Sequence, residues 1–159
     1  MTLLRFGRLD VTLDGSRAIL AGRLDDSALL GPLLGQLPEG PITLDTAAIW
    51  FVNSIGMREW TRLVRGLRAR GSQITLERVA DVLMTQMNLV SELAGAVAIV
   101  SFHAQYLCGG CGAEHTQLVE VAPHAQALRM LAPPKLPCPE CGAAMELGDF
   151  PERYLTIFK

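Results

Sequence analysis

Four cysteines, grouped in two Cys-x-x-Cys pairs, constrain this chain more than any other feature. The pairs are Cys108-Gly-Gly-Cys111 and Cys138-Pro-Glu-Cys141. Four thiolates suit a closed tetrahedral zinc site, which leaves no coordination position for a substrate. The spacing therefore predicts one structural Zn²⁺ per chain, bound by Cys108, Cys111, Cys138 and Cys141 within a small β zinc ribbon.

Other uses of these cysteines remain open at this point. A redox-active pair, iron in the same four-sulfur shell, or disulfides would need the same residues. Neither pair opens a helix directly after a strand, as a thioredoxin-like motif does. His103, His115 and His124 could compete as ligands, but four cysteines already complete a shell. We expect the three histidines to be surface or strand residues.

Charge and hydropathy narrow the function classes. The chain has 159 residues and a formal net charge of -2, which argues against a dedicated nucleic-acid binder. No apolar run is long enough to cross a membrane, and residues 1–10 lack the apolar core of a secretory signal. We therefore expect a cytoplasmic protein without membrane insertion. In that reducing compartment, paired cysteines are metal ligands more often than disulfides.

Composition changes near residue 105, because all four cysteines and six of the nine prolines follow it. We predict an α/β domain at 1–104, with an open mixed sheet and packed helices, and a zinc-ribbon module at 105–159. In the first part, strands are predicted at 9–13, 17–21, 41–44, 73–76 and 96–102, an apolar edge at 50–52, and helices at 25–37, 57–70 and 80–93. In the second part, strands are predicted at 115–121, 145–147 and 154–158, and a loop or short helix at 122–131. With no Gly/Ser linker between Phe102 and Cys108, the last strand of the first part should run directly into the first cysteine pair.

The helix predicted at 57–70 has two contrasting faces. Apolar residues recur on one side at steps of three and four, which is typical of a helix packed on a core. The opposite side carries a row of arginines, interpreted either as a docking surface for an acidic partner or as a solvated helix face: Arg58, Arg62, Arg65, Arg68 and Arg70.

Three segments resemble the STAS domains, the family of anti-sigma-factor antagonists. They are Ile42-Thr-Leu-Asp45, Trp50-Phe-Val-Asn-Ser-Ile-Gly-Met57 and Gly22-Arg-Leu-Asp25. The resemblance covers about residues 9–104. It implies a single sheet with helices packed on it, and a non-catalytic role in binding a protein partner.

The resemblance also points to Ser54, which occupies the position that a cognate kinase phosphorylates in family members that switch partners. Asn53 stands where the family has Asp, and Ile55 stands where it has a second Ser. From the residues alone, Ser54 lies at or beside the N-cap of the following helix, so it is either a switch or simply a cap. Gly56 either allows a close approach of helix to strand or is incidental. The predicted partner-binding residues are Asn53, Ile55, Gly56, Arg58, Arg62 and Arg65.

These observations favour an intracellular signalling or scaffold protein, whose partner is an anti-sigma-factor-type serine kinase or a component of a larger complex. One alternative is a STAS-like accessory subunit that docks on the ATPase of a membrane transport complex. Another is a nucleic-acid-binding zinc-ribbon protein. No nucleophile–base set or phosphate-binding glycine loop is recognisable, so we predict neither an enzyme nor a small-molecule substrate.

Overall fold

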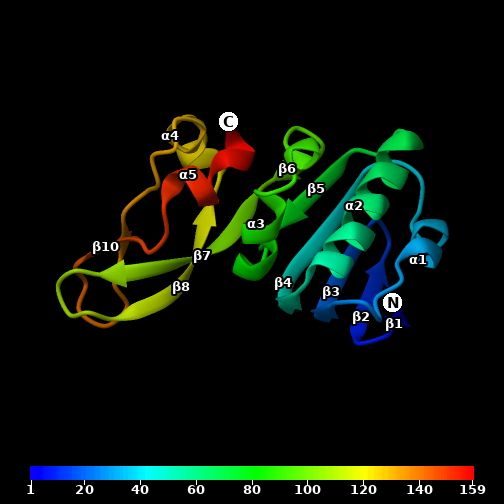
Figure 1. Ribbon diagram of the computed structural model, residues 1–159, viewed down its shortest axis with the longest axis horizontal. Coiled ribbons are helices and arrows are strands. Elements are labelled where there is room, and N and C mark those ends of the chain that lie inside the picture. The colour runs from blue at the N-terminus through cyan, green and yellow to red at the C-terminus, as the bar shows by residue number, and fades with distance from the viewer.

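The computed structural model describes residues 1–159 and contains two sheets, one of six strands and one of four (Figure 1). The six-stranded sheet is mixed, because β1 to β3 are antiparallel neighbours whereas β3 to β6 are parallel. This confirms the predicted α/β class. Its strands, in both chain and spatial order, are β1 (Thr2–Phe6), β2 (Leu9–Asp14), β3 (Arg17–Leu24), β4 (Ile42–Val52), β5 (Ile74–Glu77) and β6 (Ala98–Ile99).

The strands predicted at 9–13 and 17–21 are present as β2 and β3, and they form a hairpin with Gly15 at a φ of +60° in the turn. Strand β1 was not predicted. It pairs with β2 through a second tight turn, in which Gly7 has a φ of +63°. Positive φ costs glycine little, so both turns follow from local sequence. The signal for β1 was therefore Gly7, since its own side chains are mostly exposed.

Strand β4 is one continuous element of 11 residues, although the sequence predicted separate pieces at 41–44 and 50–52. Its register against β3 shifts twice, between Ile19 and Ala21 and again between Gly22 and Arg23. At the first irregularity the Ala47 amide donates to Oδ1 of Asp45. Such bulges break the alternation of inward and outward residues. The middle of the strand therefore lacks the hydrophobic alternation from which strands are predicted.

Helices α1 (Gly31–Gln36) and α2 (Ser54–Ala69) cover one face of this sheet, and α3 (Asp81–Met87) lies beside β4 toward the second sheet (Figure 1). The predicted apolar stripe of α2 is buried and joins the same core as Leu20, Leu44 and Leu76 of the strands. No helix combines the length and the apolar character that a membrane span requires.

Two helix predictions need correction. The helix predicted at 25–37 begins only at Gly31, because the Asp25 carboxylate accepts hydrogen bonds from Ser27 and does not cap a helix. Pro32 then occupies the first turn, where a proline is well tolerated. The helix predicted at 80–93 ends at Met87 and is followed by a separate 3₁₀ turn, η1 (Ser91–Leu93).

The second sheet is antiparallel, with the spatial order β8-β7-β10-β9. The single strand predicted at 96–102 divides at Val100, so that β6 joins the first sheet and β7 continues to the first cysteine pair. The expected domain boundary between residues 104 and 105 therefore lies inside β7. Strand β8 was predicted. The elements are β7 (Ser101–Cys108), β8 (Glu114–Glu120), η2 (Ala122–His124), α4 (Ala125–Arg129), β9 (Leu136–Pro137), β10 (Ala144–Leu147), α5 (Pro151–Tyr154) and η3 (Thr156–Phe158).

The strand predicted at 154–158 is wrong, because this segment forms the end of α5 and the turn η3. Tyr154, Leu155 and Ile157 are all buried. In so short an apolar run, helical and extended periodicity cannot be told apart. Pro151, which opens α5, was the local signal for a helix.

This C-terminal segment fastens the second sheet to α3. The Asn88 side chain donates from Nδ2 to the carbonyl of Tyr154 at 2.7 Å and accepts at Oδ1 from the Ile157 amide at 2.8 Å. The Tyr154 hydroxyl donates to the His103 carbonyl on β7 at 2.5 Å. One core cluster therefore runs through both sheets.

Helix α2 approaches the end of β3 unusually closely, and Gly56 makes this approach feasible. A Cβ atom at residue 56 would lie 1.8 Å from the Leu24 carbonyl oxygen and 3.0 Å from the Asp25 amide nitrogen. Both neighbours are backbone, so a side chain could not be accommodated by rotation. Of the two interpretations from sequence, the close-approach one is confirmed.

Replacing Gly56 with alanine is expected to destabilise the fold by about 1–3 kcal/mol or more, because α2 must move away from β3. Chemical denaturation gives the free energy of unfolding. Gly35→Ala in α1 is the matched control, since a Cβ there meets no atom within 4 Å. It should be neutral or slightly stabilising. Equal stability of the two variants would contradict the close contact.

Candidate functional site

The four cysteines predicted as ligands lie together at one end of the second sheet. Their Sγ atoms all lie within 4.8 Å of one another. Cys108 and Cys141 are 3.5 Å apart, and Cys111 and Cys138 are 3.7 Å apart. Zinc–thiolate bonds of about 2.3 Å in a tetrahedron place the sulfurs roughly 3.8 Å apart. The cluster is thus positioned to hold a metal ion and is consistent with zinc.

The two cysteine pairs have the same local geometry. The Gly112 amide donates to the Cys108 carbonyl and the Gly142 amide to the Cys138 carbonyl, both at 2.9 Å. Each glycine has a positive φ, 76° and 78°, which closes the turn. The Glu140 amide points at the Cys138 sulfur at 3.4 Å. Equivalent turns contributed by two hairpins explain how residues about thirty apart in sequence meet around one centre.

The pKa values of the thiols differ within the cluster: the neighbouring Cys141 thiol raises the pKa of Cys111, and the Cys108 thiol raises the pKa of Cys141. The Cys111 amide is the main reason that the pKa of Cys108 falls to about 7, which favours the thiolate form that binds metals. None of the three histidines belongs to the cluster. His115 instead contacts Glu140, with 2.8 Å between Nε2 and Oε2.

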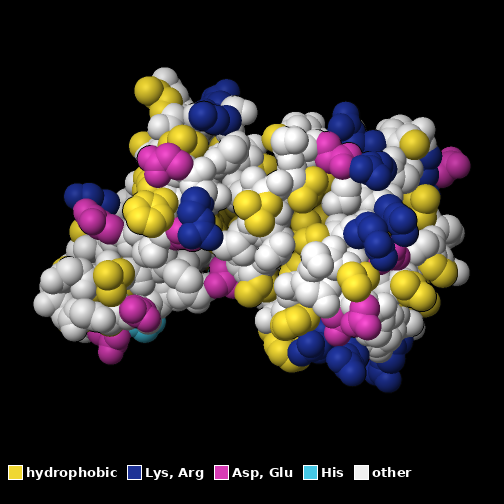
Figure 2. Space-filling view, in the orientation of Figure 1, with side chains coloured by type: hydrophobic (Ala, Val, Ile, Leu, Met, Phe, Trp, Pro, Cys, Tyr) yellow, Lys and Arg dark blue, Asp and Glu magenta, His cyan; other side chains and the backbone are white.

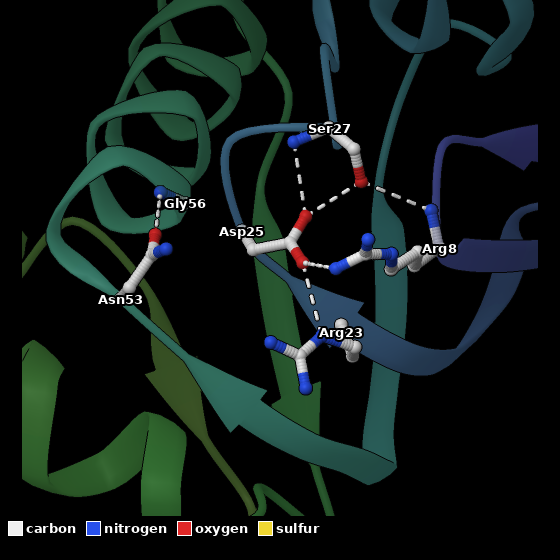
Figure 3. A network of polar contacts seen from close by, with 6 residues as sticks. All are labelled: Arg8, Arg23, Asp25, Ser27, Asn53 and Gly56. Carbon is white, nitrogen blue, oxygen red and sulfur yellow. Dashed lines mark hydrogen bonds and ion pairs between the residues drawn. The ribbon is translucent and has the colours of Figure 1, made fainter.

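The second candidate site lies at the start of α2. Asn53 is the N-cap residue, because its Oδ1 accepts from the Gly56 amide at 2.8 Å (Figure 3). Ser54 is the first helical residue and is exposed. The interpretation of Ser54 as the cap is therefore wrong, and its hydroxyl makes no hydrogen bond within the protein. Asn53 preserves the cap that the aspartate of the resembled motif would supply.

Ser54 borders a groove of about 350 Å³ between α2 and the segment after α3. Arg58, one helical turn beyond Ser54, also lines this groove and forms no ion pair. Of the other predicted partner-binding arginines, Arg62 pairs with Glu59 at 3.1 Å and Arg65 pairs with Glu92 through two bonds of 2.8 and 2.5 Å. Further lining residues are Met57, Thr61, Gln86, Leu89 and Val90.

The sequence did not reveal the polar network beside this helix start. Asp25 is buried, with 1% of its surface exposed, and accepts from the Ser27 hydroxyl at 2.6 Å, the Ser27 amide at 2.9 Å and Arg23 Nε at 3.0 Å (Figure 3). Arg8 approaches the same carboxylate at 3.5 Å, and its amide donates to the Ser27 hydroxyl. The Ser27 hydroxyl and Arg23 are the main causes that lower the pKa of Asp25 to about 2.

Buried Glu59, on α2, binds the loop between β3 and α1 that contains Asp25 and Ser27. Its Oε1 accepts from the Leu30 amide at 3.0 Å, which ties the connection between β3 and α1 to α2. Together with the contact of Gly56 and Leu24, this bond fixes the loop that flanks Ser54. The signal for Glu59 in the sequence was weak, because an acid among arginines reads as an ordinary surface residue.

No protein-family model matches this chain, and no curated protein is significantly similar to it in sequence.

The Asp25 network predicts a specific pH dependence. A carboxylate whose pKa is lowered to about 2 in the folded state stabilises that state above the ordinary pKa of about 4, and this contribution is lost as the pH falls toward 2. The stability advantage of the natural protein over Asp25→Asn should therefore be constant from pH 5 upward and shrink from about pH 4 to pH 2. Urea unfolding over this range measures it, with Asp14→Asn, at an exposed and unpaired residue, as the control. An advantage that does not shrink between pH 4 and pH 2 would refute the assignment.

The metal centre predicts about one zinc ion per purified chain. Cys138→Ser should abolish tight zinc binding and unfold the second sheet, because structural zinc in small modules contributes on the order of 10–16 kcal/mol. Elemental analysis and amide NMR spectra measure the two effects. His115→Ala is the control and should retain the metal. A protein that folds fully without any metal would contradict this prediction.

Proposed function

We propose that this chain is a non-catalytic signalling or scaffold protein that binds a protein partner next to Ser54. In this proposal residues 1–104 form a STAS-like domain, and residues 105–159 form a zinc ribbon. The observation that carries it is the exposure of Ser54 at the first position of a capped helix, where it borders a groove. The mixed sheet with helices on one face is consistent with this reading, as is the position of the motif at the junction of β4 and α2.

The surroundings of Ser54 suit a phosphorylation switch. A phosphate adds nearly two negative charges and three acceptor oxygens. At the first position of α2 it would meet the positive end of the helix dipole, and Arg58 lies on the same face of the helix one turn away. A partner that packs into the groove would then face a new charge at its border. The proposed consequence is release of the partner on phosphorylation.

The zinc ribbon has a structural role in this proposal. The C-terminal segment that follows the ribbon forms hydrogen bonds with the Asn88 side chain at the end of α3. Leu89, Val90 and Glu92, shortly after Asn88, line the groove. A stable ribbon would therefore keep one wall of the groove in place.

The test is phosphorylation of Ser54. Incubation with ATP and anti-sigma-factor-type serine kinases should add one phosphate, detected by intact mass and located by peptide mapping. Ser54→Ala should remove it, whereas Ser16→Ala, at an exposed turn residue, should not. Ser54→Asp should weaken capture of the cognate kinase on the order of tenfold or more through charge placed in the groove.

Absence of phosphate at Ser54 with every such kinase would overturn the switch. Stable co-purification with a transport ATPase, unaffected by Ser54→Asp, would instead identify the chain as an accessory subunit of a transport complex.

A further inference from the structure

Beyond Ser101, which is buried, the second sheet has an outward face that is bordered by α3 at one end and open over the rest. Along β7, Phe102, Ala104 and Tyr106 point into the core, so the alternating residues point away from it. Residues paired across neighbouring strands share a face, so the pairings of β7 with β8 and β10 identify the rest. We define the outward face as His103, Gln105, Leu107, Glu114, Thr116, Leu118, Glu120 and Glu146.

This outward face is acidic. The four strands of the second sheet contain neither lysine nor arginine. Glu114, Glu120 and Glu146 are exposed; Glu146 pairs with Lys135 at 3.6 Å, whereas Glu114 and Glu120 form no ion pair. Burial lowers the pKa of His103, so its ring adds no charge at neutral pH. In Figure 2, the part of the molecule that contains the second sheet lies on the left, and acidic side chains lie along its lower edge. Most lysines and arginines lie elsewhere.

The same face also exposes apolar side chains. Leu107 is 46% exposed and Leu118 is 37% exposed. Where the face meets β4 and α3, His103 and Thr116 line a hollow of about 370 Å³ together with Ile49, Trp50 and Val82. Trp50 is 62% exposed and adds apolar surface to the hollow, while the Arg23 guanidinium lies over its ring at 4.9 Å from the centroid. Asp81, at the start of α3, adds a carboxylate to the wall of this hollow.

We propose that the outward face and its adjoining hollow form a second protein-docking surface, separate from the Ser54 groove. The partner is a protein segment that carries lysine or arginine next to apolar side chains. The two unpaired glutamates and Asp81 would attract the basic residues, while Leu107, Leu118 and the hollow take up the apolar ones. The same charges repel a phosphate backbone, so this chemistry disfavours nucleic acid as the partner.

Fluorescence anisotropy with labelled peptides tests the proposal on the full zinc-loaded chain. The probes are a peptide that alternates lysine and leucine pairs, its counterpart with glutamate for lysine, its counterpart with serine for leucine, and a single-stranded oligonucleotide. We expect only the first to bind well. Glu114→Lys/Glu120→Lys should weaken its binding on the order of tenfold at low salt, and less at high salt.

The matched control is Asp14→Lys/Glu39→Lys. It changes two exposed, unpaired acids in the part of the chain that forms the six-stranded sheet, and it alters the net charge equally. It should bind the peptide like the natural protein, as should Ser54→Asp, so this result is independent of the proposed function. If the lysine variant fails to fold, Glu114→Gln/Glu120→Gln should still weaken binding. Equal binding by the two charge-reversed pairs, or preferential binding of the oligonucleotide, would overturn the proposal.

Discussion

The contact between Gly56 and the Leu24 carbonyl is the constraint on which the candidate site at Ser54 depends. It brings the start of α2 against the end of β3, where the Asp25 amide lies 3.0 Å from the position of a Cβ at residue 56. Asp25 then organises Ser27 and Arg23, and Glu59 binds the Leu30 amide from the helix. Backbone contact, buried carboxylates and the Asn53 cap therefore act together to present Ser54 on a fixed support.

The metal cluster and this site are linked through the C-terminal segment. The chain leaves the second cysteine pair through β10 and returns to α3, where Asn88 binds the Tyr154 carbonyl and the Ile157 amide. Phe102 packs against Tyr154 and Phe158, with ring centroids 6.2 and 5.3 Å apart. A small sheet with little core of its own thus shares the core of the larger one.

The features that the sequence predicted well are those with a local signal. Two Cys-x-x-Cys pairs, the strands predicted at 9–13 and 17–21, and the apolar stripe of α2 each depend on a pattern over a few residues. The misses depended on partners distant in sequence. Asp25 falls in the segment predicted as the helix at 25–37, but its carboxylate binds Ser27, Arg23 and Arg8. The bulges in β4 interrupt its alternation, so one strand was predicted as two pieces. Glu59 has the sequence context of a surface acid, but it is buried and accepts a hydrogen bond from the Leu30 amide.

The distribution of charge gives the two proposed surfaces different chemistry. Around Ser54, Arg65 is neutralised by Glu92 and Arg62 by Glu59, so Arg58 is the unpaired cation of the groove. On the second sheet the unpaired charges are the carboxylates of Glu114 and Glu120. Under the two proposals, the unpaired charges of the two surfaces differ in sign, so the surfaces would favour segments of different charge. This opposition would let a single chain hold two unlike partners, with the Asn88 connection fixing the distance between them.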